Sequence, residues 1–472
     1  MNCPLFLGEI MQHVIYNPSK DTIAAISTPQ AAGGIGVIRI SGEDARKVAG
    51  KVFFSASGKN LDDIKGYTAL YGRVRDKDGD IDEAIALNFK KPYSYTGENV
   101  VEISCHGGLT VMRRVLRAVL AAGASPAGPG EFTRRAFLNG KIGLTEAESV
   151  MQLISAKGEM AAKSALAEHD GALDKKIRSV RDGLVSAAAH LSAWADYPEE
   201  DIEQVTPENL SKTLLNSEKS LKDLLDMFDA GRAIREGVET VIAGRPNAGK
   251  STLMNLLSGC ERSIVTQYAG TTRDIVEDTV LLGGIPLLLA DTAGIRQSGD
   301  PVELIGVDRA YGKIRASRLV LAVFDASQPL DADDMKLIDE IENSNCIAVI
   351  NKIDLPVKID INTLKEKFKY IVYMSAISGR GLEDLEKTVA AVLGTERFDP
   401  ADGMLFTERQ RDDAQKALGF VKEALEALKD GVTLDAVTVS VDEAVDALLE
   451  LTGEKASVTV VDSVFSHFCV GK

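Results

Sequence analysis

The sequence predicts a multidomain protein: an α+β domain first, then an α-helical domain that is interrupted by an inserted α/β domain. From Asp21 to Asn139, short β-rich runs alternate with glycine turns. Two helical stretches flank a segment in which strands and helices alternate, the pattern of a parallel sheet. At 472 residues the chain is also too long for one ordinary core. We expect domains at residues 21–139, 140–235, 236–395 and 396–472, with the second and fourth forming one discontinuous helical domain.

Composition favours a globular protein of the cytoplasm that has no membrane partner. The chain is 45% hydrophobic and 26% charged, and no apolar run approaches the roughly 18 residues that a membrane helix needs. Met1–Lys20 has no basic start and does not resemble a secretory signal. The five cysteines form no CxxC pair, which argues against a disulfide framework or a zinc site. The net charge of −16 indicates that any contact with RNA is local or shared with a partner protein.

Within the first domain, β-rich runs predict strands, and one apolar-periodic run after His106-Gly107-Gly108 predicts a helix over Leu109–Ala122. The expected strands are Thr22–Ile26, Gly36–Ile40, Ala84–Phe89 and Val100–Ser104.

Long helices are expected on both sides of the inserted segment. Thr145–Glu148 fits a capping box at a helix start, and helical sequence then continues to Tyr197 and again over Pro207–Phe228. The tail Thr407–Lys472 is also helical in pattern. We expect the helices before and after the insert to pack together.

The inserted segment carries a phosphate-binding loop. The expected strand Val238–Ala243 is followed by the sequence GRPNAGKS at residues 244–251 and then by a helix that includes Leu253–Leu257. The glycines let backbone amides face a phosphate at a helix N-terminus, Lys250 reaches the β- and γ-phosphates, and Ser251 binds Mg²⁺. The residues expected to bind the nucleotide here are Asn247, Ala248, Gly249, Lys250, Ser251 and Thr252.

Further motifs follow in the order of a guanine-nucleotide site. Strand Leu287–Ala290 precedes Asp291, Thr292, Ala293 and Gly294, which face Mg²⁺ and the γ-phosphate. Strand Leu319–Phe324 comes next, and strands Ile347–Ile350 and Ile371–Met374 then lead into Asn351, Lys352 and Asp354 and into Ser375 and Ala376. A carboxylate at Asp354 accepts two hydrogen bonds from N1–H and the amino group of guanine, an arrangement that adenine lacks. The domain is therefore predicted to be a P-loop GTPase.

The loop between the P-loop and Asp291 predicts a switch that senses GTP. Thr272 would complete the Mg²⁺ shell, and oxygens of Asn247 and of the loop Thr266–Ile275 suit a monovalent cation near the phosphates. The loop residues expected at the nucleotide are Thr266, Gln267, Tyr268, Ala269, Gly270, Thr271 and Thr272. Ile295 stands where Ras-like proteins place a water-orienting Gln, and Glu303 is the nearest carboxylate downstream. From the residues alone, Glu303 is as well explained as a solvated helix residue.

Several segments resemble the MnmE (TrmE) family of tRNA-modification GTPases over nearly the whole chain. They are GGIGVIRISG at 33–42, YTGE at 95–98, HGG at 106–108, PGEFTRRAFLNGK at 129–141, AGTTRD at 269–274 and FCVGK at 468–472. The resemblance implies an N-terminal domain like tetrahydrofolate-binding domains, a discontinuous helical domain and an inserted G domain. Met1–Lys20 extends beyond the family's usual start, and the loop Pro29–Gly33 lacks an Arg that the family often has there.

The resemblance also implies a function and partners. N-terminal domains pair into a homodimer, and a partner, MnmG (GidA), contributes FAD within a heterotetramer or larger complex. Together they add an aminomethyl or carboxymethylaminomethyl group at C5 of the wobble uridine, position 34, of certain tRNAs. The one-carbon unit comes from tetrahydrofolate in its 5-formyl or 5,10-methylene form, and K⁺ activates GTP hydrolysis.

Site residues follow from the resemblance position by position. Folate contacts are implied for Arg39, Glu102, Lys141 and Lys472, K⁺ contacts for Asn247, Thr266, Tyr268 (through its carbonyl) and Thr271, and Mg²⁺ contacts for Ser251 and Thr272. Glu303 falls at the family's water-orienting glutamate, so the catalytic residues are expected to be Glu303, Lys250 and Thr272. Cys469 is either a thiol that takes part in the chemistry or a small packing residue.

Two other functions compete with this interpretation. One is a ribosome-assembly GTPase of the Era or EngA kind, which should carry a basic KH-like module. The other is a folate-binding enzyme fused to an unrelated regulatory GTPase. Whether the modification product requires GTP hydrolysis separates the alternatives.

Overall fold

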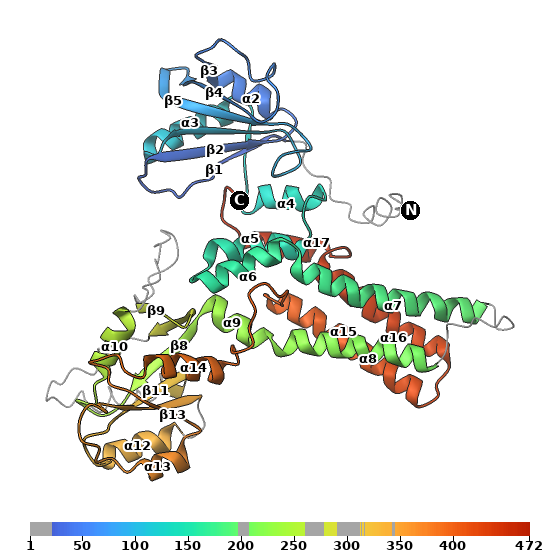
Figure 1. The fold of residues 1–472 in the computed structure, drawn as a ribbon. Coiled ribbons are helices and arrows are strands. Elements are labelled where there is room, and N and C mark those ends of the chain that lie inside the picture. The colour runs from blue at the N-terminus through green and yellow to red at the C-terminus, as the bar shows by residue number, and fades with distance from the viewer. Residues whose placement is uncertain are drawn as a thin grey trace. The chain divides into compact units, whose positions relative to one another are not determined.

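The computed structural model describes residues 21–196, 207–259, 278–289, 312, 314–315, 317–341 and 345–472. These residues fall into two compact units, which we describe separately. The first contains the described residues up to Met151 and from Val441 onward, and the second contains the described residues in between (Figure 1). Within this described part, every helix is too short or too polar to span a bilayer.

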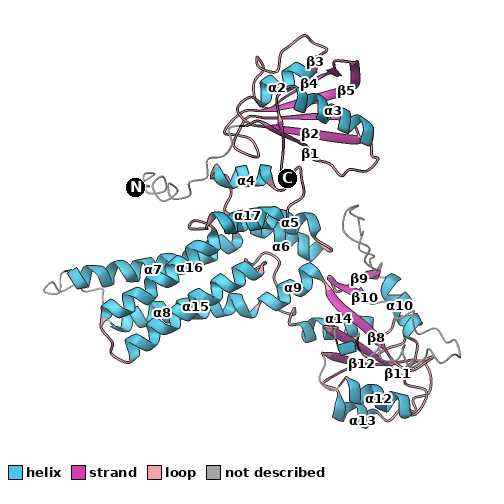
Figure 2. Ribbon diagram, turned by 180° about the vertical axis from the view of Figure 1, so that it is seen from behind, coloured by secondary structure: helices cyan, strands magenta, loops and turns pink. Residues whose placement is uncertain are grey.

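A seven-stranded sheet forms the first unit's N-terminal domain, in the order β3-β4-β5-β6-β2-β1-β7. All neighbouring strands are antiparallel except β1 and β7. Helices α2 and α3 pack against one face and enclose the domain's main apolar core (Figure 2). The elements are β1 Ile23–Ile26, β2 Ile35–Ser41, α2 Ala45–Val52, β3 Phe53–Ser55, β4 Thr68–Asp76, β5 Gly79–Phe89, β6 Val100–His106, α3 Leu109–Ala121 and β7 Ser125–Pro126.

The predicted strands and helix of this domain are confirmed, and the structure adds α2, β3, β4 and β7. In β4, the residues alternate between the core and the open face, so that Leu70 and Val74 are buried while Tyr71 is exposed. Helix α4, Glu131–Leu138, lies on the other side of β1, where Phe132 packs against Ile23.

Three further helices contribute to the first unit, and two expectations about them are corrected. They are α5 Leu144–Ser155, α16 Leu434–Thr452 and α17 Val458–Ser466. Helix α5 begins before the expected Thr145 cap, because the carboxylate of Glu146 accepts the amide of Gly143 at 2.7 Å and caps the helix there. The prediction of helix to Lys472 is also wrong: α17 ends at Ser466, and Val470 instead forms a β-bridge with Pro129.

Long helices of the second unit pack side by side. They are α6 Glu159–His169, α7 Ala172–Asp196, α8 Pro207–Asp226, α9 Phe228–Glu236 and α15 Glu408–Lys429. Helix α15 packs along α8, and α8 also packs on α7. Alanines at 414, 417 and 424 are fully buried on α15, and such small side chains let helices approach closely. This pairing confirms that helices before and after the insert pack together.

The inserted segment is a doubly covered, mainly parallel sheet in the order β13-β12-β11-β8-β10-β9, in which only β9 is antiparallel to its neighbour. Its strands are β8 Val238–Ala243, β9 Asp278–Leu282, β10 Ile285–Leu289, β11 Leu319–Asp325, β12 Cys346–Asn351 and β13 Tyr370–Tyr373. Its helices are α10 Lys250–Gly259, α12 Ala332–Glu340, α13 Ile361–Lys367 and α14 Leu382–Leu393.

Two separate apolar clusters cover the two faces of this sheet. Every residue of β11 and β12 is buried, as expected for central parallel strands. The carboxyl ends of β8, β11, β12 and β13 meet at one edge, where ligands of such sheets bind. The multidomain fold class expected from the sequence is confirmed.

Candidate functional site

The loop between β8 and α10 makes a turn that only glycine permits at two positions. Gly244 has φ +153°, and a Cβ there would lie 2.4 Å from the carbonyl oxygen of Val323. Gly249 has φ +101°, and its Cβ would lie 2.2 Å from Nδ2 of Asn351. The backbone therefore wraps tightly into the N-terminus of α10, where amides and the helix dipole favour an anion.

Lys250 is held in place by the loop itself. Its ammonium group donates to the carbonyls of Gly244 at 2.6 Å and Arg245 at 2.8 Å. Burial lowers the pKa of Lys250, so an anion in contact with the ammonium would compensate for the lost hydration. The next residue, Ser251, is exposed in the first turn of α10, and its hydroxyl is the kind of oxygen ligand that Mg²⁺ prefers.

Asn351 ties together three parts of the site. It ends β12, is 2% exposed, and donates from Nδ2 to the carbonyl of Ala248 at 3.0 Å. Its Oδ1 accepts the amide of Ala376 at 2.9 Å. One buried side chain thereby sets the spacing between the phosphate loop and the loop after β13.

Lys352 links the same region to Asp325 at the end of β11. Its ammonium lies 2.6 Å from Oδ2 of Asp325 and 2.7 Å from the carbonyl of Asn247. Burial alone would raise the pKa of Asp325, but hydrogen bonds from Lys352 and Ser327 lower it. Asp325 was not predicted from the sequence, although its place at the end of a buried strand was a usable signal.

The predicted base-binding residues lie on two neighbouring turns. Asp354 is exposed and makes no hydrogen bond or ion pair with another described residue. Ser375 is 1% exposed, and its hydroxyl is likewise unpartnered within the described structure. The same turns present Leu355 at 44% and Ile377 at 79% exposure, two apolar side chains that the sequence analysis missed. A flat, partly apolar base fits this combination of one outward carboxylate and two exposed aliphatic groups.

Arg245, inside the P-loop, joins the loop to α12. Its guanidinium lies 2.7 Å from Asp331 and 3.2 Å from the buried Asp334. Burial raises the pKa of Asp334, whereas backbone and Arg245 hydrogen bonds lower that of Asp331, which caps α12. This anchor holds the loop on its outer side and was also not predicted.

Part of the predicted site lies outside the described residues. This holds for the switch residues Thr266, Gln267, Tyr268, Ala269, Gly270, Thr271 and Thr272, for Asp291, Thr292, Ala293 and Gly294, and for Ile295 and Glu303. Among the expected ligands that are described, Asn247, Ala248, Gly249, Lys250, Ser251 and Thr252 form the β8–α10 turn and the start of α10.

A second charged site lies in the first unit, on the open face of the sheet. Arg39 on β2 and Glu102 on β6 are direct cross-strand partners, and Nε of Arg39 lies 2.8 Å from Oε1 of Glu102. The guanidinium lies 5.2 Å from the ring centroid of Tyr95 and 5.6 Å from that of Phe132. Two aromatic rings thus orient the cation, and both were missed as site residues.

Lys472 joins this pair through the folded-back C-terminus. The carbonyl of Lys472 accepts the amide of Phe132 at 3.1 Å, and the hydroxyl of Ser27 donates to Gly471 at 3.0 Å. Gly471 has φ +99°, and a Cβ there would meet the carbonyl of Ile26 at 2.3 Å, so glycine is required at this crossing. Burial and then the charge of Arg39 lower the pKa of Lys472, while Glu102 and Cys469 oppose this shift.

The structure brings together three of the four predicted folate contacts. Lys141 instead donates to the carbonyl of Pro92 at 3.4 Å, on the loop that carries Tyr95, and no described contact joins it to Arg39. Cys469 is exposed, and its carbonyl accepts the amide of Lys472 at 3.3 Å. The cation-rich group, with Glu102 beside it, suits a ligand that has both carboxylates and N–H donors.

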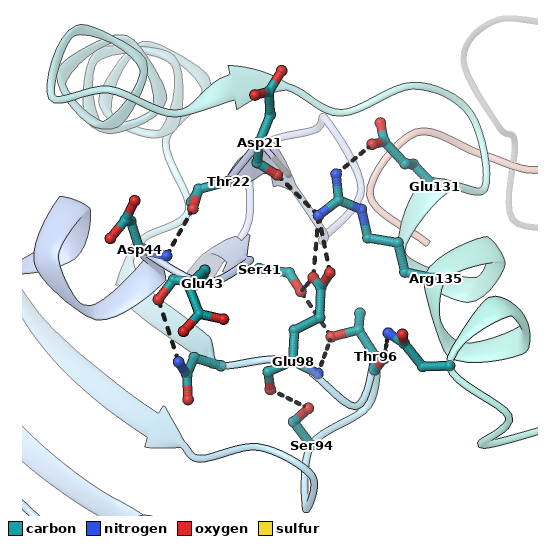
Figure 3. A network of polar contacts seen from close by, with 12 residues as sticks. Asp21, Thr22, Ser41, Glu43, Asp44, Ser94, Thr96, Glu98, Glu131 and Arg135 are labelled. Carbon is teal, nitrogen blue, oxygen red and sulfur yellow. Dashed lines mark hydrogen bonds and ion pairs between the residues drawn. The ribbon is translucent and has the colours of Figure 1, made fainter. Parts of the chain in front are cut away.

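A buried polar network supports the aromatic walls of this second site (Figure 3). Arg135 on α4 is 5% exposed and donates to Glu98 at 3.1 Å, to Glu131 at 2.9 Å and to the carbonyl of Asp21 at 3.0 Å. Glu98 also accepts the hydroxyl of Ser41 at 2.7 Å. The network fixes α4 and the 92–99 loop, and these elements carry Phe132 and Tyr95.

Comparisons with known proteins cover nearly the whole chain. Residues 22–141 match the family model "GTP-binding protein TrmE N-terminus", and residues 144–469 match the model "MnmE helical domain". The tRNA modification GTPase MnmE of Alkaliphilus metalliredigens is 40% identical over 96% of this chain and 99% of its own length. The protein of the same description from Symbiobacterium thermophilum is 42% identical over 96% of this chain and 100% of its own.

Two solved structures resemble part of the chain. Era from Aquifex aeolicus bound to GDP and AlF₄⁻ is 27% identical, with a TM-score of 0.27, over 39% of this chain and 66% of its own. The G domain of the FeoB iron transporter of T. maritima is 25% identical, with a TM-score of 0.25, over 33% of this chain and 98% of its own.

Proposed function

Because the chain belongs to the MnmE family of tRNA modification GTPases, we propose that it uses GTP hydrolysis and a folate one-carbon unit to modify the wobble uridine of tRNA. The protein is a GTP hydrolase, it binds GTP, and its substrate in modification is tRNA. The domain bounds given above, 21–139, 140–235, 236–395 and 396–472, are part of the proposal. The observation that carries the folate step is the convergence of Arg39, Glu102 and Lys472 in the first unit.

The donor set fits a tetrahydrofolate. Among the described contacts Arg39 uses only Nε, so both Nη groups stay available for an acceptor oxygen of the ligand close to the edge that Glu102 would bind. Glu102 has a second carboxylate oxygen for the N–H edge of a pterin, and the ring of Tyr95 offers a flat apolar surface. When bound, a 5-formyl or 5,10-methylene folate would supply the one-carbon unit, and Lys472 and Lys141 would be the cations for its carboxylates.

The nucleotide chemistry is assigned to residues around the β8–α10 loop. Lys250 would leave the carbonyls of Gly244 and Arg245 to contact the phosphates, with Ser251 and Thr272 as the Mg²⁺ ligands. Asn247, Thr266, Tyr268 and Thr271 would hold K⁺, and Glu303 would orient water. Asn247 has a left-handed backbone conformation, with φ 63°. Residues other than glycine rarely adopt it, and where they do they are often part of a binding site.

A homodimer through N-terminal domains is supported by an open sheet face. Tyr71, Ile85, Ser104 and Val37 are successive cross-strand partners on β4, β5, β6 and β2. Tyr71 and Ile85 are large and exposed, and a second copy would cover them. We also propose an FAD-carrying MnmG partner, in a heterotetramer or larger complex, on the basis of the chain's membership of the MnmE family. We further propose that the protein works in the cytoplasm, because its substrate is tRNA.

The folate proposal is tested by calorimetric titration of 5-formyltetrahydrofolate into the full chain without nucleotide. We expect saturable binding that weakens at least tenfold when Lys472 is deleted, because the deletion removes a half-buried cation. The matched control is Lys429→Ala, an exposed lysine of α15. Absence of binding by the unmodified chain would refute the folate step, and equal binding by the deletion variant would remove Lys472 from the site.

The cation proposal is tested by GTP hydrolysis in KCl and in NaCl at equal ionic strength. K⁺ should accelerate hydrolysis, because the proposed oxygen cage suits the larger ion. Glu303→Ala should retain GTP affinity and lose most hydrolysis. Equal rates in the two salts would contradict the K⁺ site, and an unchanged rate in the variant would return Glu303 to a solvated surface role.

A further inference from the structure

Charge is distributed unevenly along the chain. Residues 21–141 contain 17 Lys and Arg against 13 Asp and Glu, a formal charge of +4. All other residues together contain 37 against 57, a formal charge of −20. A polyanionic substrate is repelled by most of this protein, so its contacts are expected on the N-terminal domain.

On the open face of the sheet, the exposed cations of β4 are matched by carboxylates. Arg73 lies 2.8 Å from Asp80 and 3.0 Å from Glu83, and Arg75 lies 2.5 Å from Asp80. The carboxylates already occupy these guanidinium groups, and Tyr71 and Ile85 are exposed beside them. This face suits a protein surface better than a phosphate backbone.

The helical face of the same domain differs. Helix α3 contains three arginines and no acidic residue. Arg113 and Arg117, one turn apart, are exposed and form no ion pair within the described chain, whereas Arg114 lies 2.7 Å from Asp76. Two cations on the outer side of α3 are therefore available to a ligand.

Helix α2 extends this group of cations. It too has no acidic residue between its first and last positions, and Lys51 in its last turn donates to the carbonyl of Ala122, at the end of α3, at 2.8 Å. The exposed ammonium of Lys51 thus lies at the C-terminal end of α3, the helix that carries Arg113 and Arg117. The acidic groups near α2 gather at its other end, where Asp44 pairs with Lys47.

We propose that this helical face, defined by Lys51, Arg113 and Arg117, binds the sugar–phosphate backbone of tRNA. The proposal rests on the protein's role in tRNA modification. The row spans about 14 Å along α3 at 1.5 Å per residue, long enough to contact several phosphates of one strand. It lies on the face of the sheet opposite to Arg39 and Glu102, so a bound tRNA would leave the proposed folate site and the proposed dimer face uncovered.

The test is fluorescence anisotropy of a labelled, unmodified tRNA transcript with the full chain over a KCl series. The triple variant Lys51→Glu, Arg113→Glu, Arg117→Glu should bind at least tenfold more weakly at 0.1 M salt. The slope of log K against log salt should fall by about 2, since each lost phosphate contact removes about 0.7 to 0.9. The control reverses three exposed lysines of the second unit, Lys365, Lys387 and Lys429, which changes the net charge equally.

Three outcomes would overturn the proposal. They are wild-type affinity and slope in the triple variant, an equal loss in the control variant, and no binding of tRNA by the wild-type chain even at the lowest salt. GTP hydrolysis by both variants should stay at the wild-type rate, which verifies that they fold. Failure of the proposed function would be seen separately, as full wobble-uridine modification in cells that lack the protein.

Discussion

Two residues of the nucleotide site have backbone conformations that residues other than glycine rarely adopt. Asn247 has φ 63° and Lys352 has φ 64°, and the ammonium of Lys352 donates to the carbonyl of Asn247. Such conformations cost of order 1–3 kcal/mol each and persist where surrounding contacts impose them. Here Asp325 and Asn351 provide those contacts, so the strain is localised at the point where the base and phosphate regions meet.

We propose that Asp354 selects guanine, and a single substitution at this residue should reverse the base preference. Asp354→Asn replaces an acceptor of two N–H groups by an amide that can donate to the C2 carbonyl of xanthine. We expect GTP to bind about 10- to 100-fold more weakly, the effect of one or two lost charge-assisted hydrogen bonds, and XTP to bind more tightly than GTP. Competition against a fluorescent nucleotide measures both affinities.

The control for this experiment is Asp360→Asn, an exposed aspartate that caps α13 away from the base turns. The Asp360→Asn variant should prefer GTP to XTP as strongly as the wild-type chain does. A variant of Asp354 that still prefers GTP to XTP would contradict the assignment of this residue to the base.

His106 provides a pH-dependent prediction in the first unit. Its Nδ1 lies 2.8 Å from Oδ1 of Asp82, and this hydrogen bond and the carboxylate's charge raise the pKa of His106 above its usual 6.5. The pair therefore stabilises the fold fully below about pH 6.5 and loses that contribution as pH rises through the higher folded-state pKa. An NMR titration should show His106 titrating above 6.5 and returning toward it in Asp82→Asn. Asp80→Asn, which removes a carboxylate that pairs with arginines instead, should leave the His106 titration in place; a shift there would contradict the pairing.

At the scale of single residues, the sequence marked the residues that we propose to carry the chemistry. It missed the residues that hold those side chains in position. Lys250, Asn351 and Asp354 stand in local motifs whose spacing is itself the signal. Asp325 and Arg135 act through partners far away in the chain, such as Lys352 and Glu98, and no local pattern marks such pairs. Tertiary contacts between distant segments decide these roles.

Helix α4 is held on the sheet by Arg135, which makes a stability prediction possible at the scale of elements. Arg135→Ala leaves the carboxylates of Glu98 and Glu131 half-buried without their cation, and breaking a buried pair in this way costs about 3 kcal/mol. We expect hydrogen–deuterium exchange over 131–138 and β1 to accelerate by a corresponding factor of about 100.

The control for Arg135→Ala is Arg113→Ala, which removes an exposed arginine of α3. It should change the free energy of unfolding by no more than about 0.5 kcal/mol. If Arg135→Ala left the exchange of α4 unaltered, α4 would be held by Phe132 and its apolar neighbours alone.

Element boundaries were predictable where one local rule applied and not where two competed. At α5, Thr145 satisfies a capping pattern, but Gly143 and Glu146 satisfy it two residues earlier, and the earlier start buries Leu144 and Ala147. In the tail, helical composition continues past Ser466, yet Gly471 and the bridge at Pro129 turn the last residues onto the sheet. The helical periodicity of a sequence contains no information about pairing between distant segments.

At the scale of the whole molecule, the two sites are built in different compact units. The nucleotide residues lie in the second unit, whereas Arg39, Glu102 and Lys472 lie in the first. The first unit brings distant segments of the chain together, because the segment from Cys469 to Lys472 packs on Ser27 and Phe132. Such an organisation would let GTP and the proposed folate bind independently, although the proposed reaction requires both.

That organisation predicts that a substitution in one site abolishes binding of one ligand and leaves binding of the other ligand unchanged. Arg39→Ala should abolish binding of 5-formyltetrahydrofolate and leave GTP affinity and hydrolysis within about twofold, because no described contact links Arg39 to the second unit. Asp354→Asn should do the reverse, retaining folate binding and losing GTP. In cells that carry either variant, mass spectrometry of tRNA nucleosides should show the same loss of the wobble-uridine modification. If Arg39→Ala also lost GTP binding, the two units would share one ligand-dependent state; if it retained full modification, the Arg39 site would have no part in the reaction.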